Sequence, residues 1–147
     1  MPSRRDVVEC ARTFLGTRWR HQGRLKGSGP SSGVDCAGLV IKVAHELGLF
    51  TYDYTDYTRQ GDWGAFVGRF REHMIESSLD KAKPGSILIL RESAYPCHCG
   101  IVSKWEQDDR LFIHAYAVQH KVIEDVFNDE WRSMTITVFE YPGLDEE

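Results

Sequence analysis

The segment Gly33-Val34-Asp35-Cys36-Ala37-Gly38-Leu39-Val40 begins the most regular pattern in this sequence, and it decides the fold. From Cys36 onward, apolar residues recur every three or four positions, which is typical of an amphipathic helix. These positions are Cys36, Leu39, Val40, Val43, Ala44 and Leu47. Asp35 is of the type preferred at a helix N-cap, and Gly48 is of the type preferred after the last turn. We therefore predict a helix over residues 36–47 with a cysteine on its first turn.

A cysteine at this position has a chemical reading and a structural one. The unpaired N–H groups of the first turn and the positive end of the helix dipole favour thiolate, which lowers the thiol pKa from its usual ~8.5. The same N–H groups can hold the oxyanion that forms when the sulfur attacks a carbonyl carbon. In the structural reading, Cys36 is one more small apolar residue buried on its helix. The helix pattern alone leaves both readings open.

The flanking sequence supplies helices first and strands second. Ser3 can cap an upstream helix that ends at Gly16, and a short helix is expected around Trp63 to Met74. After Lys83-Pro84-Gly85, β-rich runs follow at hairpin distances, over residues 86–90, 98–105, 111–116, 121–127 and 134–141. This order predicts an α+β fold in which the N-terminal helices pack on an antiparallel sheet.

Length and composition limit the remaining possibilities. The chain has 147 residues, which suits a single domain over 1–147, and its net charge of −4 argues against nucleic acid as a partner. Four cysteines are few for a disulfide framework. No apolar run is long enough to span a membrane, and the first residues do not resemble a secretory signal. We expect a soluble protein that is made in the cytoplasm without a signal peptide and does not insert into membranes.

A cysteine nucleophile needs a base, and six histidines are available. If residues 104 and 110 pair across a turn at 106–109, His114 faces Gly100 and lies diagonal to His98 on the same face of the hairpin. His98 then fits the base and His114 the residue that orients it. A slip of one residue would turn His114 to the other face, so an unrelated structural histidine remains the alternative. His120 is a second candidate for the third group.

The segment Cys97-His98-Cys99, with His114 and His120, also has the ligand types of a zinc site. Its spacing argues against one, because adjacent strand residues point to opposite faces and no Cys-x₂-Cys knuckle is present. The glycine patterns that bind nucleotide phosphates are absent as well. We therefore predict no metal site and no nucleotide chemistry.

Taken together, these blocks resemble the NlpC family of papain-like cell-wall cysteine peptidases, from about residue 5 to about residue 140. The matching blocks are Leu15–Trp19, Val34–Val40, Lys83–Ser86, His98–Val102 and Phe112–Ala115. The resemblance implies a papain-like fold and hydrolysis of an amide in the peptide stems of peptidoglycan, typically between γ-linked D-glutamate and a diamino acid. It implies Cys36 as the nucleophile, His98 as the base and His114 as the orienting residue, with no cofactor.

Three residues near the cysteine block, Trp19, His21 and Asp35, are the predicted substrate-binding residues. Two positions depart from the family pattern. The family usually has serine where Ala37 stands, and tyrosine is common where Trp19 stands. An indole N–H can donate but not accept a hydrogen bond. We expect these departures to affect substrate selectivity rather than the chemistry.

The stretch His21-Gln22-Gly23-Arg24 resembles the phage-borne branch of the family, whose genes lie with tail-tip genes. This resemblance implies carriage in a phage or phage-like tail and action at the cell wall from outside. The tyrosines of residues 52–57 are the candidate surface for tail-tip proteins, unless they only cover the core beneath a long loop. Two other functions remain open, a structural tail-tip component with little turnover and a different amidase or acyltransferase on this fold.

Overall fold

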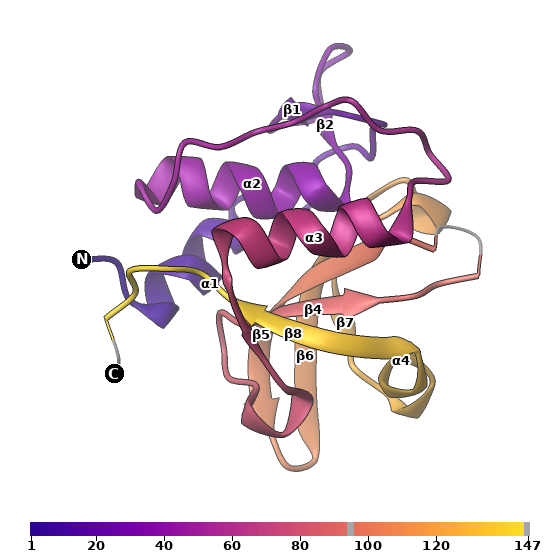
Figure 1. Ribbon diagram of the computed structural model, residues 1–147. Coiled ribbons are helices and arrows are strands. Elements are labelled where there is room, and N and C mark those ends of the chain that lie inside the picture. The colour runs from indigo at the N-terminus through magenta and orange to yellow at the C-terminus, as the bar shows by residue number, and fades with distance from the viewer. Residues whose placement is uncertain (94–95, 146–147) are drawn as a thin grey trace.

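The computed structural model describes residues 1–93 and 96–145 of the chain. Its main element is a six-stranded antiparallel sheet with strand order β3-β8-β4-β5-β6-β7 (Figure 1). The strands are β3 (Ile75–Ser77), β4 (Ile87–Leu90), β5 (His98–Glu106), β6 (Asp109–Tyr116), β7 (Lys121–Val126) and β8 (Thr135–Glu140). The helices are α1 (Arg4–Arg12), α2 (Cys36–Leu47), α3 (Trp63–His73) and α4 (Asp129–Met134), with 3-10 turns η1 (Leu79–Lys81) and η2 (Ala117–Gln119). A small ribbon of β1 (Arg24–Leu25) and β2 (Gly33–Val34) precedes α2.

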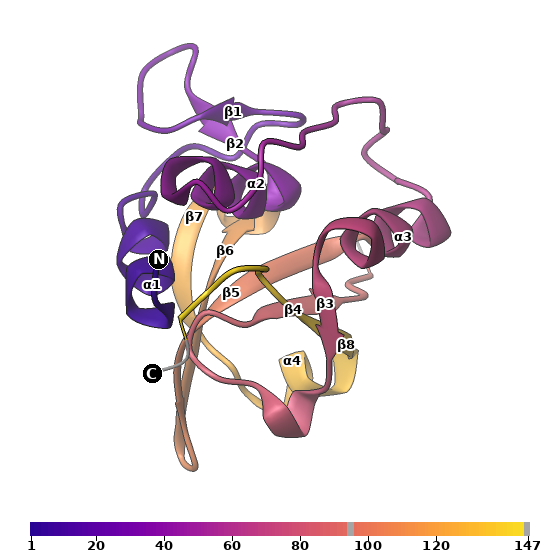
Figure 2. The ribbon, with the colours of Figure 1, turned by 60° about the vertical axis from the view of Figure 1, so that its left-hand side comes forward.

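The sheet separates two layers of buried side chains. Helices α1, α2 and α3 cover one face, where Ile101 and Ile113 belong to the larger buried cluster (Figure 2). We call this side the helical face. On the other side, α4 adds Trp131 to a smaller cluster that contains Phe112. We call this second side the aromatic face.

Helix α2 has the boundaries that the sequence predicts. The Asp35 carboxylate accepts a hydrogen bond from the backbone N–H of Gly38 at 2.8 Å, so Asp35 is the N-cap. Gly48 adopts a left-handed conformation with φ of 69°, which ends the helix. Gly38 is required by contact rather than by conformation, because a Cβ there would collide with the backbone oxygen of Gly23. The prediction of a helix that begins at Cys36 is confirmed.

Helix α1 begins as predicted and ends early. Ser3 and Asp6 form a capping box, in which each side chain accepts the other's backbone N–H. The helix stops at Arg12 rather than at Gly16, so the predicted C-terminus was wrong. Instead, Phe14 and Leu15 continue in tight turns, and the N–H of Gly16 donates to the carbonyl of Val122 on β7.

The β5–β6 hairpin corrects the predicted register near its turn. Lys104 pairs with Leu111 rather than with residue 110. A bulge at Ser103 then shifts the ladder by one position, so that Val102 pairs with Phe112. Beyond the bulge the pairing is the one expected from the sequence. A Cβ built on Gly100 would lie 3.1 Å from the Cβ of His114, which confirms that these two residues face each other.

The C-terminal part of the sheet differs from a simple meander. Strand β8 lies between β3 and β4, so it is near one edge of the sheet, whereas β7 forms the other edge. The sequence did not predict β3, the β1–β2 ribbon or α4, which are all short. Met134 ends α4 instead of beginning a strand, because Asn128 caps that helix by accepting the N–H of Trp131. The predicted α+β architecture with helices on an antiparallel sheet is nevertheless confirmed.

Within the described residues, no helix combines the length and the apolar character that a bilayer span requires.

Candidate active site

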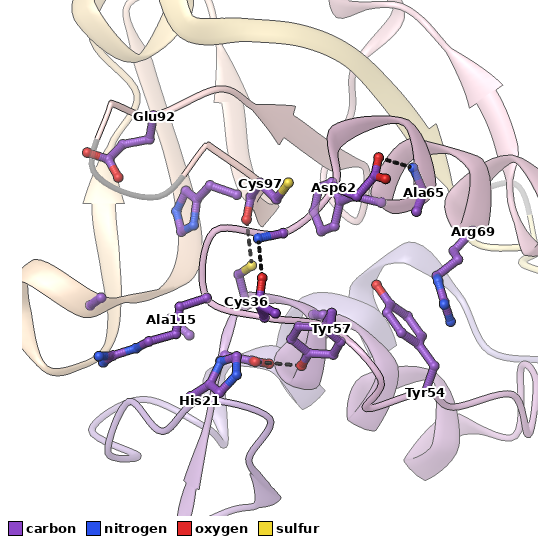
Figure 3. A pocket seen from close by; sticks show the side chains of 18 of the residues that line it. His21, Cys36, Tyr54, Tyr57, Asp62, Ala65, Arg69, Glu92, Cys97 and Ala115 are labelled. Carbon is purple, nitrogen blue, oxygen red and sulfur yellow. Dashed lines mark hydrogen bonds between the residues drawn. The ribbon is translucent and has the colours of Figure 1, made fainter.

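Cys36 is the first residue of α2 and lies in a cavity of about 250 Å³ (Figure 3). Its side chain is half-buried, and its thiol donates a hydrogen bond to the carbonyl oxygen of Cys97 at 3.4 Å. The cavity wall includes α2 with the preceding segment, the connection from α2 into α3, α3 itself, and the ends of β5 and β6. Its lining includes Trp19, His21, Asp35, Ala37, Tyr57, Arg59, His98 and Tyr116. The sulfur is therefore enclosed but reachable.

The surroundings of Cys36 favour its ionised form. Hydrogen bonding with the Cys99 thiol, followed by hydrogen bonding and charge interaction with His98, lowers the pKa of Cys36 to about 6, against the opposing effect of burial. The other thiols behave in the opposite way. Burial raises the pKa of Cys10 and of Cys97 to about 11, and it raises the pKa of Cys99 well above its usual value. Cys36 alone among the four cysteines has the electrostatics of a nucleophile.

The two predicted histidines meet on the aromatic face. His98 Nε2 lies 2.8 Å from His114 Nδ1, and both rings are buried. Hydrogen bonding and charge interaction link His98 to Cys36, although burial lowers the pKa of His98 overall. The structure therefore brings Cys36, His98 and His114 together in one continuous chain of interacting groups. His120 takes no part in it, because its side chain is exposed and its backbone oxygen accepts the N–H of Trp19.

Sequence reasoning missed Asp125, which continues the chain of groups beyond His114. Its carboxylate oxygen lies 3.1 Å from His114 Nε2. Hydrogen bonding to His114 lowers the pKa of Asp125. Asp125 pairs with Phe112 across β6 and β7, so it is diagonal to His114 on the same face. The diagonal-neighbour argument that joined His98 to His114 would have found it, had it been applied to the next hairpin.

Aromatic rings hold the two imidazoles in place. The ring of His114 is stacked on Phe112 at 4.2 Å and on Tyr116 at 4.9 Å between centroids. Trp131 of α4 meets the same ring edge-on at 5.2 Å. Such packing leaves the imidazole little rotational freedom, which fixes the direction of its nitrogen atoms. No sequence pattern marked Trp131 for this role, because α4 itself was not predicted.

Asp35, a predicted substrate-binding residue, is almost fully engaged by the protein. One carboxylate oxygen accepts from the N–H of Gly38 and lies 3.2 Å from the Arg24 guanidinium. The other accepts from the N–H of Gln22 at 2.7 Å and from the Tyr57 hydroxyl at 2.5 Å. The residue is 4% exposed, although it belongs to the cavity lining. Its contacts indicate that it positions the start of α2 and the loop above it.

Trp19 and His21, the other two predicted substrate-binding residues, both line the cavity. His21 is half-buried and meets the Tyr57 ring edge-on, with centroids 5.5 Å apart. The centroid of the Trp19 ring lies 5.0 Å from the guanidinium carbon of Arg59. Ala37, where the resemblance led us to expect serine, also lines the cavity and offers no hydroxyl there.

The tyrosines of residues 52–57 turn toward the molecule. Tyr52 stacks on His73 at 3.6 Å between centroids, and its hydroxyl accepts a hydrogen bond from Arg69. Tyr54 and Tyr57 line the cavity (Figure 3). All three side chains are half-buried. These contacts favour the alternative in which the tyrosines cover the core and the site beneath a long loop.

The cysteines and histidines considered as zinc ligands do not converge on one point in the part of the chain that the structure describes. In residues 1–93 and 96–145, no group of three or more histidine, cysteine, aspartate or glutamate side chains is placed to hold a metal ion. The predicted alternation explains this result in part, because His98 contributes to the aromatic face while Cys99 belongs to the cluster on the helical face.

The fold and the site together define an α+β protein in which a cysteine at a helix N-terminus lies beside a buried histidine pair. No family model matches the sequence, and no curated protein matches it. Among solved structures, the NlpC/p60 domain of the peptidoglycan hydrolase SagA aligns with a TM-score of 0.60 and 20% identity, over 91% of this chain and 95% of that chain.

Two further structures support the same assignment of the fold. A lipoprotein-like NLP/P60 protein of Staphylococcus aureus aligns with a TM-score of 0.62 and 16% identity, over 97% of this chain and 42% of that one. Ly7917, solved with the hydrolysing product of MDP, aligns with a TM-score of 0.60 and 14% identity, over 96% of this chain and 64% of that chain. This chain thus spans less than half of the S. aureus protein. At these identities the likeness establishes the fold, which is that of NlpC/P60 domains.

Proposed function

We propose that residues 1–147 form one cysteine peptidase domain that hydrolyses an amide in the peptide stems of peptidoglycan, between γ-linked D-glutamate and a diamino acid. One observation carries this proposal. A thiol with its pKa lowered to about 6 stands at a helix N-terminus, interacts with a buried histidine pair and opens into a cavity. Two proteins that share the fold are described as a peptidoglycan hydrolase and as bound to a hydrolysis product of MDP.

The proposed reaction follows the positions of these groups. His98 accepts the proton of Cys36, and the thiolate attacks the amide carbon. The first-turn N–H groups of α2 stabilise the oxyanion that results. The imidazolium of His98 then donates its proton to the departing amine, which leaves a thioester on Cys36. A water molecule that gives up a proton to His98 hydrolyses this acyl-enzyme and regenerates the thiol.

The decisive experiment is incubation of the purified protein with defined peptidoglycan fragments and identification of the products by mass. A mass increase of one water across the D-glutamyl bond, seen as two new fragments, supports the proposal. Cleavage of another amide, or transfer of the acyl group to an added amine, would favour the amidase or acyltransferase alternative. No turnover, despite normal labelling of Cys36 by a thiol reagent, would favour a structural tail-tip component.

We also propose that a phage or phage-like tail delivers the protein, on the basis of the resemblance carried by His21–Arg24. Tail-tip proteins would then be its partners, and the virion and the cell wall its sites of residence and action. Mass spectrometry of purified particles tests this part separately. Absence of the chain from the particles would point to release from lysing cells instead.

A further inference from the structure

We infer that Asp125 is a positioning residue which, through His114, determines which nitrogen of His98 receives the proton of Cys36. This inference rests on the proposed function for its kinetic consequences, but its structural content is independent of any substrate. Four groups from α2, β5, β6 and β7 form the chain in question, in the order Cys36, His98, His114 and Asp125.

The direction of each hydrogen bond follows from the carboxylate. Asp125 is ionised and can only accept, so the atom of His114 that faces it, Nε2, carries the proton. A neutral His114 then has an unprotonated Nδ1. His98 Nε2, which lies 2.8 Å from that atom, must be the donor. The nitrogen of His98 that is left unprotonated is Nδ1, and it is the atom free to accept the thiol proton.

Without the Asp125 carboxylate, no acceptor determines which nitrogen of His114 carries the proton. His114 could carry its proton on Nδ1, which would place two N–H groups face to face unless His98 also changed tautomer. In that second arrangement Nδ1 of His98 holds a proton before the reaction begins and cannot act as the base. Burial lowers the pKa of His114 overall, and the hydrogen bond and the charge of Asp125 oppose that lowering, so Asp125 favours positive charge on the histidine pair.

Other charged groups near the pair do not replace Asp125. Cys36 on α2 interacts with His98, and Glu92, which follows β4, lines the cavity beside it. Tyr116 on β6 stacks on His114, and Glu130 of α4 acts electrostatically on Tyr116. Among the described residues, Asp125 is the one whose carboxylate lies within hydrogen-bond distance of either ring, at 3.1 Å from His114 Nε2.

The first test reads the tautomers directly. Imidazole ¹⁵N NMR of the Cys36→Ala variant should show His114 protonated at Nε2 and His98 protonated at Nε2. In Cys36→Ala with Asp125→Ala, both rings should populate mixed tautomers. The control is Glu124→Gln on the same strand, whose carboxylate instead pairs with Arg12. Unchanged ¹⁵N shifts on loss of Asp125 would overturn the inference even if no substrate has been found.

The second test is kinetic. Asp125→Ala should lower kcat about 10- to 100-fold, at or below the lower end of direct acid–base contributions because Asp125 acts through His114, and should leave KM within about twofold. Asp125→Asn, which keeps an acceptor but removes the charge, should recover part of kcat. In Asp125→Asn the basic limb of the pH–rate profile should move to lower pH, since the imidazolium loses a stabilising charge. An Asp125→Asn profile that coincides with that of Glu124→Gln would contradict the inference.

A separate observation concerns Arg59, an exposed residue of the cavity lining. Its guanidinium lies 5.0 Å from the centroid of the Trp19 ring. The other guanidinium in the described lining, that of Arg69, is already bound to Asp56 at 3.0 Å and to the Tyr52 hydroxyl at 2.9 Å. Within residues 1–93 and 96–145, no carboxylate forms an ion pair with Arg59. Its stacking on an indole fixes the cation while its N–H groups stay available.

We infer that Arg59 binds a carboxylate of the substrate, and that it selects stems with a free acid next to the scissile bond. This inference deepens the proposed function, since a γ-linked D-glutamate carries a free α-carboxylate there. Guanidinium groups bind carboxylates through charge-assisted hydrogen bonds, and an amide at the same place would lose that charge. Trp19 then acts as the platform that holds Arg59.

The test compares a tripeptide that contains γ-D-glutamate with its α-amidated analogue. Arg59→Gln should raise KM about tenfold for the acid and leave the amide unchanged. Arg91→Gln is the matched control, because Arg91 stacks on Trp63 at 4.6 Å outside the cavity lining. Equal discrimination by wild type and Arg59→Gln would overturn the inference. If neither peptide is hydrolysed, calorimetric binding of both peptides to Cys36→Ala, with and without Arg59→Gln, decides the question separately from the proposed function.

Discussion

The two faces of the sheet differ in the kind of side chain they bury, and each supplies a different half of the site. The helical face is mainly aliphatic and holds the packed sides of α1 and α2, with Cys36 at its margin. The aromatic face surrounds His114 with Phe112, Tyr116 and Trp131. Aliphatic packing fixes the backbone that carries Cys36, whereas stacked rings fix the plane of the His114 imidazole. The site lies where the two layers meet, at the ends of β5 and β6.

We expect the largest effect from a substitution at the margin of the helical face. Cys36→Ala should abolish hydrolysis, because the other thiols have raised pKa values and lack its place on the helix. Product analysis by mass would measure the loss, and circular dichroism would show that the fold is kept. Cys10→Ala is the control on the same face, and it should retain activity. Full hydrolysis by Cys36→Ala would rule out the nucleophile proposed here.

Removing the contribution of the aromatic face should have the next largest effect. His98→Ala should lower the rate by about 10²-fold or more, which is the scale of general acid–base catalysis. His114→Ala should have a smaller effect, since it acts through His98. Steady-state rates for these variants and for His120→Ala give the order. A larger loss from His120→Ala than from His114→Ala would show that the histidine pair is not the working one.

Thiol reactivity offers a milder probe of the same contrast. The alkylation rate of Cys36 by iodoacetamide should rise with pH around a midpoint near 6, because only the thiolate reacts and its pKa is lowered to about 6. Cys97, in the same cavity, should react appreciably only as the pH approaches its raised pKa of about 11. Peptide mapping after timed alkylation separates the two residues. Comparable labelling of both at pH 7 would contradict the electrostatic difference.

The smallest effects concern glycines. A Cβ on Gly100 would lie 2.7 Å from a ring carbon of Phe112 on the aromatic face, so Gly100→Ala should reduce the free energy of unfolding by about 1–3 kcal/mol. Gly68 in α3 has open space around its Cα. Gly68→Ala should therefore raise that free energy by about 0.5–1 kcal/mol through helix propensity. Urea unfolding curves measure both, and destabilisation by Gly68→Ala would show that the helical face is tighter at α3 than described.

The sequence was informative where a single periodic pattern governs the structure. The helix from Cys36 to Leu47, its Asp35 cap and the placement of His98 diagonal to His114 on one face all follow from local spacing. Features that depend on distant partners did not follow. The insertion of β8 beside β4 is set by packing between segments about 50 residues apart, and the four bonds of Asp35 require the loop that carries Tyr57. The contact between Asp125 and His114 could have been predicted from local spacing too, because the two residues are diagonal neighbours on β7 and β6.

The bulge at Ser103 bears on how relatives of this chain can be found. It takes up one extra residue between the hairpin tip and the two histidines, so the pairing at the tip and the pairing at the site are set independently. The separation of 16 positions between His98 and His114 is therefore no fixed property of the arrangement. The tip can gain or lose residues during evolution while the imidazoles keep their places. A homology search that demands constant spacing between the histidines would pass over such relatives, whereas one that allows a variable tip would retain them.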